Sequence, residues 1–243
     1  MKKEYWLIII AYIIMQFSSF IGVPFISLMG EALGISQRKL QIYSVSIWLV
    51  ISFAVTLVIV LFLLRKEMLH YNRNKPLAPV SNSILWAVGG VFLALFAQGI
   101  AARIESLLGI EMGSENTQQI IHLINTYPIV ILVTSIIGPM LEEIVFRKII
   151  FGSLHKRFNF LISALISSII FALAHGEPEH ILLYSAMGFT FAFLYVKTNR
   201  ILVPMFAHVA MNTFVVLVQS IYKNDLERMI HDAEKIQGFI GGL

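Results

Sequence analysis

The sequence predicts an all-α membrane protein, a polytopic bundle of transmembrane helices. Three observations lead to this prediction: 58% of the 243 residues are hydrophobic, only 13% are charged, and the mean hydropathy is +0.81. Soluble globular proteins average about 45–50% apolar and about 25% charged residues. The composition therefore excludes a single cytosolic domain, a disordered chain and a collagen-like repeat. The absence of cysteine excludes a disulfide scaffold, cysteine proteases and Cys-ligated zinc or iron–sulfur centres.

Apolar runs recur along the chain at lengths that suit membrane-spanning helices, which need about 20 residues. We expect about seven spans and allow six to eight, because the fifth and sixth runs are short. The runs are roughly Tyr5–Leu28, Tyr43–Leu64, Ser83–Ala102, Tyr127–Leu154, Phe160–His175, Ile181–Val196 and Ile201–Tyr222. The first run follows two lysines and has no small-x-small cleavage signal, so we expect a retained span rather than a removed signal peptide.

The basic residues predict the orientation of these spans. Lys and Arg lie in short clusters between apolar runs, so the net charge of +4 indicates a membrane face rather than a nucleic acid partner. With a cytoplasmic N-terminus, twelve of them fall inside: Lys2, Lys3, Arg65, Lys66, Arg73, Lys75, Arg147, Lys148, Lys156, Arg157, Lys197 and Arg200. Apart from the three basic residues of the C-terminal tail, only Arg38, Lys39 and Arg103 fall outside. This bias predicts a multi-pass protein with its N-terminus in the cytoplasm.

Three polar segments complete the chain. Asn72–Pro79 is a proline-containing loop, and Arg103–Thr126 is a mixed connection in which we expect one interfacial helix. The C-terminal tail carries Lys223, Arg228 and Lys235 among acids and apolar residues. This pattern is typical of an amphipathic surface helix, and we expect no chemistry there.

Two adjacent carboxylates, Glu142 and Glu143, interrupt the fourth apolar run. An ionisable side chain inside a span is costly unless it is paired or faces water, so it indicates function by default. Arg147 lies four residues after Glu143 on the same helix face, which predicts an ion pair between them. Glu142 is rotated from Glu143 by about 100°. We therefore expect Glu142 to face the interior of the bundle, without a local partner.

Polar residues also occur within two later spans. His175 ends the fifth run, and His208 and Asn212 share one face of the seventh. Glu142 and His175 are about equally far along the chain from the turn near Arg157–Phe158, so an antiparallel hairpin would place them at a similar depth in the membrane. His208 is fewer residues from its own turn near Asn199, which would place it at a shallower depth. A single histidine near the end of a span is more often interfacial than catalytic. Polar groups on three separate spans together indicate one site, within the bilayer and nearer its cytoplasmic side.

This set of residue types suits hydrolysis. A carboxylate and a histidine can activate water, and a second histidine with an amide can donate hydrogen bonds to an oxyanion. Glu142, His175 and His208 are also a common ligand set for catalytic zinc, so the residues leave open whether no cofactor or one zinc ion is needed. The only aspartates, Asp225 and Asp232, lie in the tail, which excludes a membrane diaspartyl site. The chain has no Gly-x-Ser-x-Gly and no His-Glu-x-x-His motif.

Three motifs occur in order: Glu142-Glu143-x-x-x-Arg147, Phe171-x-x-x-His175 and His208-x-x-x-Asn212. At these residues the sequence resembles the CAAX-processing and bacteriocin-processing (CPBP, Abi) intramembrane proteases, relatives of the endopeptidase that trims prenylated CAAX proteins. The resemblance implies that Glu142 and His175 activate water, and that His208 and Asn212 form the oxyanion hole. It implies that Glu143 and Arg147 support the site. The family is also described as metalloproteases, so the metal question stays open.

The resemblance covers roughly the C-terminal half of the chain. It implies an intramembrane endopeptidase with a catalytic core of about 127–222 inside one membrane domain, 1–243. The absence of an extra domain favours a prokaryotic member in a bacterial plasma membrane. Its expected partners are membrane lipids and a peptide or protein substrate, lipidated substrates included.

Two other classes of function stay open from the residues. One is a non-catalytic membrane binding or bacteriocin self-immunity protein, in which the polar cluster docks a peptide. The other is a small proton-coupled transporter, in which Glu142, His175 and His208 relay protons. The remaining polar and proline residues receive structural interpretations. We expect a solvated loop at Glu177, Glu179 and His180, surface positions for His70, His122, His155 and His231, and helix kinks at Pro128, Pro139 and Pro204.

Overall fold

The computed structural model describes residues 1–69 and 77–221, which form helices and short connections without a β-strand. The first half holds α1 (Lys3–Phe17), α2 (Ser19–Ala32), α3 (Gln37–Leu69), α4 (Val80–Leu107) and α5 (Glu115–Thr126). The second half holds α6 (Val130–Leu132), η1 (Val133–Ile137), α7 (Gly138–Glu142), η2 (Glu143–Phe151), α8 (Gly152–Leu154), α9 (Phe160–Leu173), η3 (Pro178–His180), α10 (Ile181–Thr198) and α11 (Leu202–Ile221). The predicted all-α bundle is confirmed.

Four described helices are long and apolar enough to cross a membrane: α3, α4, α10 with η3, and α11. The pair α1 and α2 adds a fifth if it is counted as one span, although it bends by 48° at Ser18. All seven apolar runs contain helix, but the fourth is divided into short segments and α9 has only 14 residues. The full-length spans among the described residues therefore number four or five, fewer than the seven runs expected.

Several sequence predictions fall outside the described residues. They concern part of the loop Asn72–Pro79, the end of the seventh run at Tyr222, and the C-terminal tail. The residues concerned are His70, Arg73, Lys75, Lys223, Asp225, Arg228, His231, Asp232 and Lys235.

The fourth run, which carries Glu142, changes helix type twice. The π-helical segments η1 and η2 lie on either side of the short α7. Pro139 in α7 has no N–H, and in a regular α-helix its ring would collide with the carbonyl four residues earlier. The wider π turn of η1 directly before α7 accommodates this proline. A kink at Pro139 stays a prediction, whereas the local π-helix next to it is observed and is a feature frequent at functional sites.

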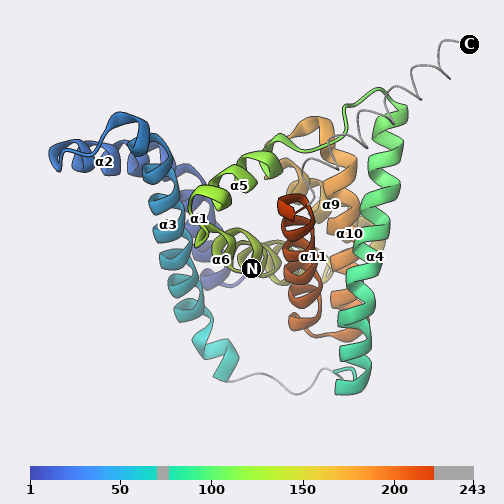
Figure 1. The fold of residues 1–243 in the computed structure, drawn as a ribbon. Helices are drawn as coiled ribbons and strands as arrows, with labels where there is room; N and C mark the ends of the chain where they lie inside the picture. The colour runs from blue at the N-terminus through green and yellow to red at the C-terminus, as the bar shows by residue number, and fades with distance from the viewer. Residues whose placement is uncertain (70–76, 222–243) are drawn as a thin grey trace, which may run out of the picture.

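The second half of the chain packs around α4 and α10. Helix α10 contacts α4, α9 and α11, and α11 also contacts α4. Gly188 of α10 lies against Ser168 of α9, where an added Cβ would come within 3.0 Å, so a small residue permits this close helix contact. In Figure 1, α3 and α4 stand on opposite sides of the bundle, and α5 crosses between them at one end.

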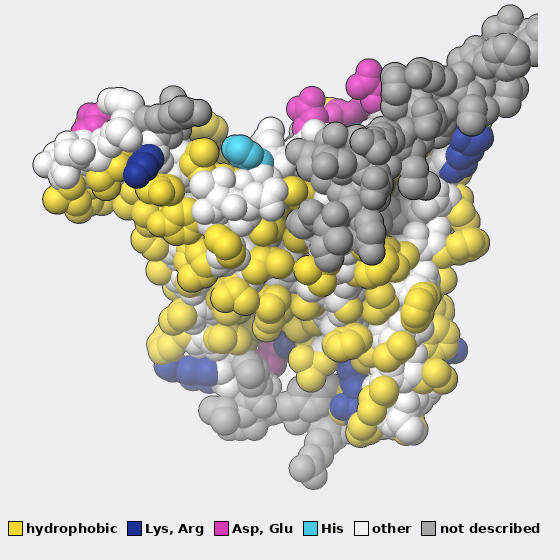
Figure 2. All heavy atoms as spheres, viewed as in Figure 1, with side chains coloured by type: hydrophobic (Ala, Val, Ile, Leu, Met, Phe, Trp, Pro, Cys, Tyr) yellow, Lys and Arg dark blue, Asp and Glu magenta, His cyan; other side chains and the backbone are white. Residues whose placement is uncertain are grey.

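The surface suits a lipid environment. Large apolar side chains such as Phe20, Ile21, Phe92 and Phe96 are more than two-thirds exposed. Figure 2 shows hydrophobic side chains over the middle of one face, with charged side chains toward its two ends. Soluble monomers rarely expose a continuous apolar surface of this extent. The chain is therefore a multi-pass membrane protein.

Candidate active site

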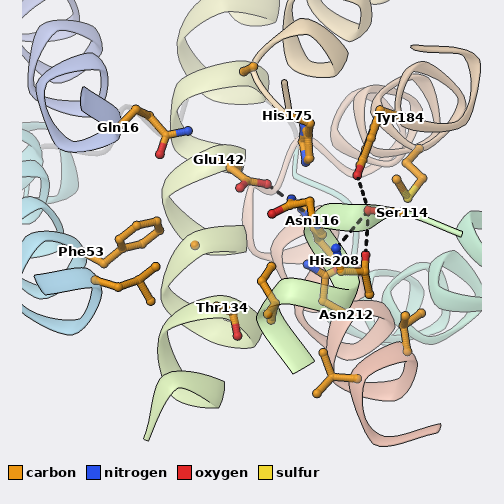
Figure 3. A pocket seen from close by; sticks show the side chains of 18 of the residues that line it. Gln16, Phe53, Ser114, Asn116, Thr134, Glu142, His175, Tyr184, His208 and Asn212 are labelled. Carbon is orange, nitrogen blue, oxygen red and sulfur yellow. Dashed lines mark hydrogen bonds and ion pairs between the residues drawn. The ribbon is translucent and has the colours of Figure 1, made fainter. Parts of the chain in front are cut away.

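A cavity of about 460 Å³ lies inside the bundle, and its lining includes Glu142, His175, His208 and Asn212. These residues come from α7, the turn after α9, and α11, so segments far apart in the chain meet here (Figure 3). Helices α1, α2, α3 and α5 supply further parts of the wall. The structure thus brings together all four residues to which the family resemblance assigns a catalytic role.

Glu142 and His208 point toward one another at the cavity wall (Figure 3). Oε2 of Glu142 lies 3.7 Å from Nε2 of His208. The Glu142 side chain is 18% exposed, whereas that of His208 is 3% exposed. Glu142 therefore faces the interior space of the bundle, as its rotation from Glu143 predicts.

Glu143 is completely buried and has partners on two helices. Its Oε2 lies 3.3 Å from Nε of Arg147, which confirms the predicted ion pair, although the two groups are not aligned as a hydrogen bond. Its Oε1 accepts a hydrogen bond of 2.9 Å from Nδ1–H of His208. Because Nδ1 is held by Glu143, the imidazole of His208 presents Nε2 to the cavity.

Arg147 is buried beside Glu143 between aromatic rings. Its guanidinium lies 4.1 Å from the ring centroid of Phe171 and 5.2 Å from that of Phe191. Its N–H groups make no hydrogen bond within the described part of the chain. The charge is thus balanced by the carboxylate of Glu143 and by the faces of the two rings.

His175 is oriented by its own helix end and by two aromatic rings. Its Nδ1–H donates to the carbonyl oxygen of Phe171 at 2.8 Å, which leaves Nε2 unprotonated in the neutral ring. The Phe171 ring lies edge-on to it, with centroids 4.5 Å apart. On another side the ring of Tyr184 stacks on it, with centroids 4.0 Å apart and planes at 26°.

The turn after α9 holds a buried carboxylate, so the prediction of a solvated loop is wrong at this residue. Glu177 is only 7% exposed, whereas Glu179 is exposed as expected. Glu177 accepts hydrogen bonds from the Asn116 N–H at 2.9 Å, the Ser114 hydroxyl at 2.8 Å and the Tyr184 hydroxyl. Burial acts to raise the pKa of Glu177, but these three hydrogen bonds outweigh it and hold the pKa below its usual range.

His180 was also expected in a solvated loop, and it is 6% exposed. Its Nδ1 lies 2.8 Å from Oε2 of Glu105, and its Nε2 lies 3.0 Å from the carbonyl oxygen of Gly113. A carboxylate and histidine at these positions could be found only through contacts between distant segments, which no spacing along the chain reveals. By contrast, His122 and His155 are exposed as predicted.

A zinc site built from Glu142, His175 and His208 does not fit the observed arrangement. Within residues 1–69 and 77–221, no three His, Cys, Asp or Glu side chains are grouped so that they could hold a metal ion. His208 is bonded through Nδ1 to Glu143, and His175 through Nδ1 to the Phe171 carbonyl, so each ring has Nε2 left for the cavity.

The fold defines a polytopic membrane protein, and comparisons with known proteins identify its family as membrane peptidases. The family model of the Rce1-like type II CAAX prenyl endopeptidases matches residues 124–214. The chain is 49% identical to YdiL of Bacillus subtilis (strain 168), named as a candidate membrane peptidase, over 100% of this chain and 99% of that protein. It is 33% identical to the membrane-embedded CAAX protease MroQ of Staphylococcus aureus (strain USA300), over 95% and 94% of the two chains.

A third relative, the UPF0177 protein YxdF of Lactococcus lactis subsp. lactis (strain IL1403), is 28% identical over 65% of this chain and 90% of its own. No solved structure matches the chain significantly. The chain belongs to the Rce1-like family and is a membrane peptidase.

Proposed function

We propose that the protein is an intramembrane endopeptidase that hydrolyses a peptide bond by water activated at Glu142 and His175. The observation that carries this proposal is the meeting of Glu142, His175, His208 and Asn212 on the wall of one cavity. Glu142 is the only carboxylate among the described residues that line it. A carboxylate that is partly exposed to an internal cavity can receive a proton from water held there.

Each side chain has a distinct role in the proposed reaction. Glu142 takes a proton from the water, His175 accepts a hydrogen bond at Nε2, and the hydroxide attacks the scissile carbonyl carbon. His208, in its doubly protonated form, and the amide of Asn212 donate hydrogen bonds to the resulting oxyanion. When the C–N bond breaks, the proton held by Glu142 passes to the leaving amine. No step in this scheme passes through a metal ion.

Glu143 and Arg147 support the site without touching the reacting atoms. The hydrogen bond from His208 to Glu143 fixes the imidazole, and the ion pair with Arg147 balances the buried carboxylate. The catalytic core is proposed to be about 127–222 of one membrane domain, and the family match at residues 124–214 supports this.

The proposed setting is a bacterial plasma membrane with the N-terminus in the cytoplasm. The bacterial relatives and the positive-inside bias support it. The proposed substrate is a membrane-associated peptide or protein. Because the relative MroQ is named a CAAX protease, lipidated peptides are included among the substrates to be tested.

The test uses the purified full chain in lipid vesicles with a library of internally quenched decapeptides, each made with and without an S-farnesyl cysteine. We expect the wild-type protein to cleave a subset of peptides, in the presence of a metal chelator as well. Glu142→Gln should lower kcat on the best peptide by about 10²-fold or more, because it removes the base and keeps the shape.

Glu179→Gln is the matched control, because Glu179 is an exposed glutamate near the site that does not line the cavity. Its kcat should equal that of the wild type. A Glu142→Gln protein that cleaves at the wild-type rate would refute the proposed base. Peptide binding without cleavage would favour the non-catalytic docking function instead.

A further inference from the structure

Tyr184 belongs to none of the motifs and is nevertheless in contact with the site. It lies on α10, is 6% exposed, and lines the cavity. Its ring stacks on the imidazole of His175, with centroids 4.0 Å apart (Figure 3). No other ring centroid lies closer to His175 in the described part of the chain. Tyr184 therefore forms one wall of the space in which this histidine can turn.

The hydroxyl of Tyr184 is tied to Glu177. It donates to Oε2 of Glu177 and lies 3.2 Å from the Ser114 hydroxyl. Glu177 also accepts from Ser114 and from the Asn116 N–H at the start of α5. The carboxylate thus joins the turn after α9, the first turn of α5 and the side of α10. A ring whose hydroxyl is held at such a junction cannot swing away from His175.

His175 needs this restraint because it lies just past the end of its helix. Helix α9 ends at Leu173, and Gly176 directly after His175 has a φ of +75°, which ends helical geometry. One hydrogen bond from Nδ1 to the Phe171 carbonyl fixes one atom of the ring but leaves its tilt free. Stacking on Tyr184 fixes the plane of the ring and, with it, the direction of Nε2.

We propose that Tyr184 is a positioning residue for His175 and that Glu177 holds Tyr184 in place through its hydroxyl. This inference rests on the proposed function of His175 in water activation. Tyr184 does not exchange protons in the reaction, since its hydroxyl is committed to Glu177. Its effect is on the orientation of the His175 imidazole toward the water, so it acts on kcat rather than on substrate binding.

The experiment compares Tyr184→Leu, Tyr184→Phe and Glu177→Gln with the wild type, on the peptide that the wild-type protein cleaves best. Tyr184→Leu should lower kcat on the order of 10²-fold, because it frees the imidazole, and leave KM within a few-fold. Tyr184→Phe keeps the ring and should recover kcat to within a few-fold of the wild type. Glu177→Gln should fall between them.

Tyr5→Leu is the matched control. Tyr5 is also a buried tyrosine whose hydroxyl donates to a glutamate, Glu67, but it does not line the cavity. Its loss should leave kcat unchanged.

A second readout does not depend on cleavage. In protein labelled with ¹³C-histidine, the Hε1–Cε1 resonance of His175 is identified by its absence in His175→Gln. Stacking under the Tyr184 ring should shift this resonance upfield in the wild type and in Tyr184→Phe. Tyr184→Leu should remove the shift and Tyr5→Leu should keep it. If Tyr184→Leu does not fold, Glu177→Gln, which retains the ring, should broaden or move the same resonance.

The two readouts separate failure of this inference from failure of the proposed function. A His175 resonance that is unchanged in Tyr184→Leu, or a wild-type kcat in that variant while Glu142→Gln is inactive, would overturn the positioning role. A wild-type protein that cleaves no peptide would refute the endopeptidase proposal, while the resonance would still report whether Tyr184 holds His175.

Discussion

Glu143 contacts both of the buried basic side chains of the site, His208 and Arg147. Its two oxygens serve different partners, His208 at 2.9 Å and Arg147 at 3.3 Å, and all three side chains are 3% exposed or less. The four-residue spacing predicted the contact with Arg147. The contact with His208 joins residues 65 positions apart, and helical periodicity contains no information about such a pair. The same limit explains why Glu177 and Glu179, two residues apart, could not be separated into a buried and an exposed glutamate.

Removal of either charge from the Glu143–Arg147 pair should destabilise the protein strongly. Arg147→Ala leaves a buried carboxylate with less compensation, and Glu143→Ala leaves a buried guanidinium without it. We expect each substitution to lower the free energy of unfolding by about 3–5 kcal/mol. Each should also lower the cleavage rate. Thermal unfolding of the purified proteins measures this.

Lys148→Ala provides the comparison at the next position. Lys148 pairs with Glu67 at 3.0 Å, but the two side chains are 16% and 26% exposed. Loss of this more solvated pair should cost about 1 kcal/mol or less. Arg147→Ala with the thermal stability of Lys148→Ala would contradict the structural role given to the buried pair.

At the scale of elements, α5 closes one end of the cavity. Residues Ser114, Asn116, Thr117 and Ile120 at its start and middle line the space. Its first turn is attached to the turn after α9 through Glu177. The sequence predicted one helix between Arg103 and Thr126, and the structure shows α5 there. Its position over the cavity follows from tertiary hydrogen bonds, which the amphipathic pattern cannot specify.

The attachment of α5 through Glu177 should depend on pH. The pKa of Glu177 is lower in the folded protein than its ordinary value of about 4.5, which the unfolded chain retains. Its hydrogen bonds therefore contribute stability above the unfolded pKa, and this contribution is lost as the pH falls through the folded value. Between about pH 6 and pH 3, the melting temperature of the wild type should fall more steeply than that of Glu177→Gln.

Glu179→Gln should follow the wild-type curve in the same titration, because Glu179 is exposed on the same turn. Parallel curves for the wild type and Glu177→Gln would show that the carboxylate does not stabilise the junction.

The π-helical segments are the elements that the sequence could not predict. Composition and apolar length identify a helical run from Tyr127 to Leu154, because they measure burial in lipid. They do not distinguish α from π hydrogen bonding, so η1 and η2 on either side of α7 appear only in the structure. The proline in α7 was the one signal of a local irregularity.

In the molecule as a whole, three of the four cytoplasmic segments expected from the charge bias meet in the structure. Lys2 and Lys148 both contact Glu67, at 2.9 and 3.0 Å, so the N-terminus, the end of α3 and η2 lie on the same side. The Lys and Arg distribution predicts this side, since it reflects how the chain is inserted. The number of full-length spans could not be predicted in the same way, because an apolar run also matches a helix of only 14 residues such as α9, or a run divided into short segments such as α6 to α8.

The orientation can be measured with single cysteines, because the natural chain has none. Glu111→Cys, on an exposed loop before α5, should react with a membrane-impermeant maleimide on intact cells. Lys3→Cys and Lys156→Cys, which are also exposed, should react only after the membrane is permeabilised. Labelling of the two lysine positions on intact cells, with Glu111→Cys protected, would reverse the proposed topology.

Glu142 on α7 and His175 after α9 are proposed to act as one unit on one water molecule. A double-mutant cycle on the best-cleaved peptide, with Glu142→Gln, His175→Gln and the double variant, measures this coupling. We predict that each single change lowers kcat by about 10²-fold or more, and that the double variant is no slower than the slower single variant. Losses that multiply in the double variant, or a single variant with wild-type kcat, would contradict the claim.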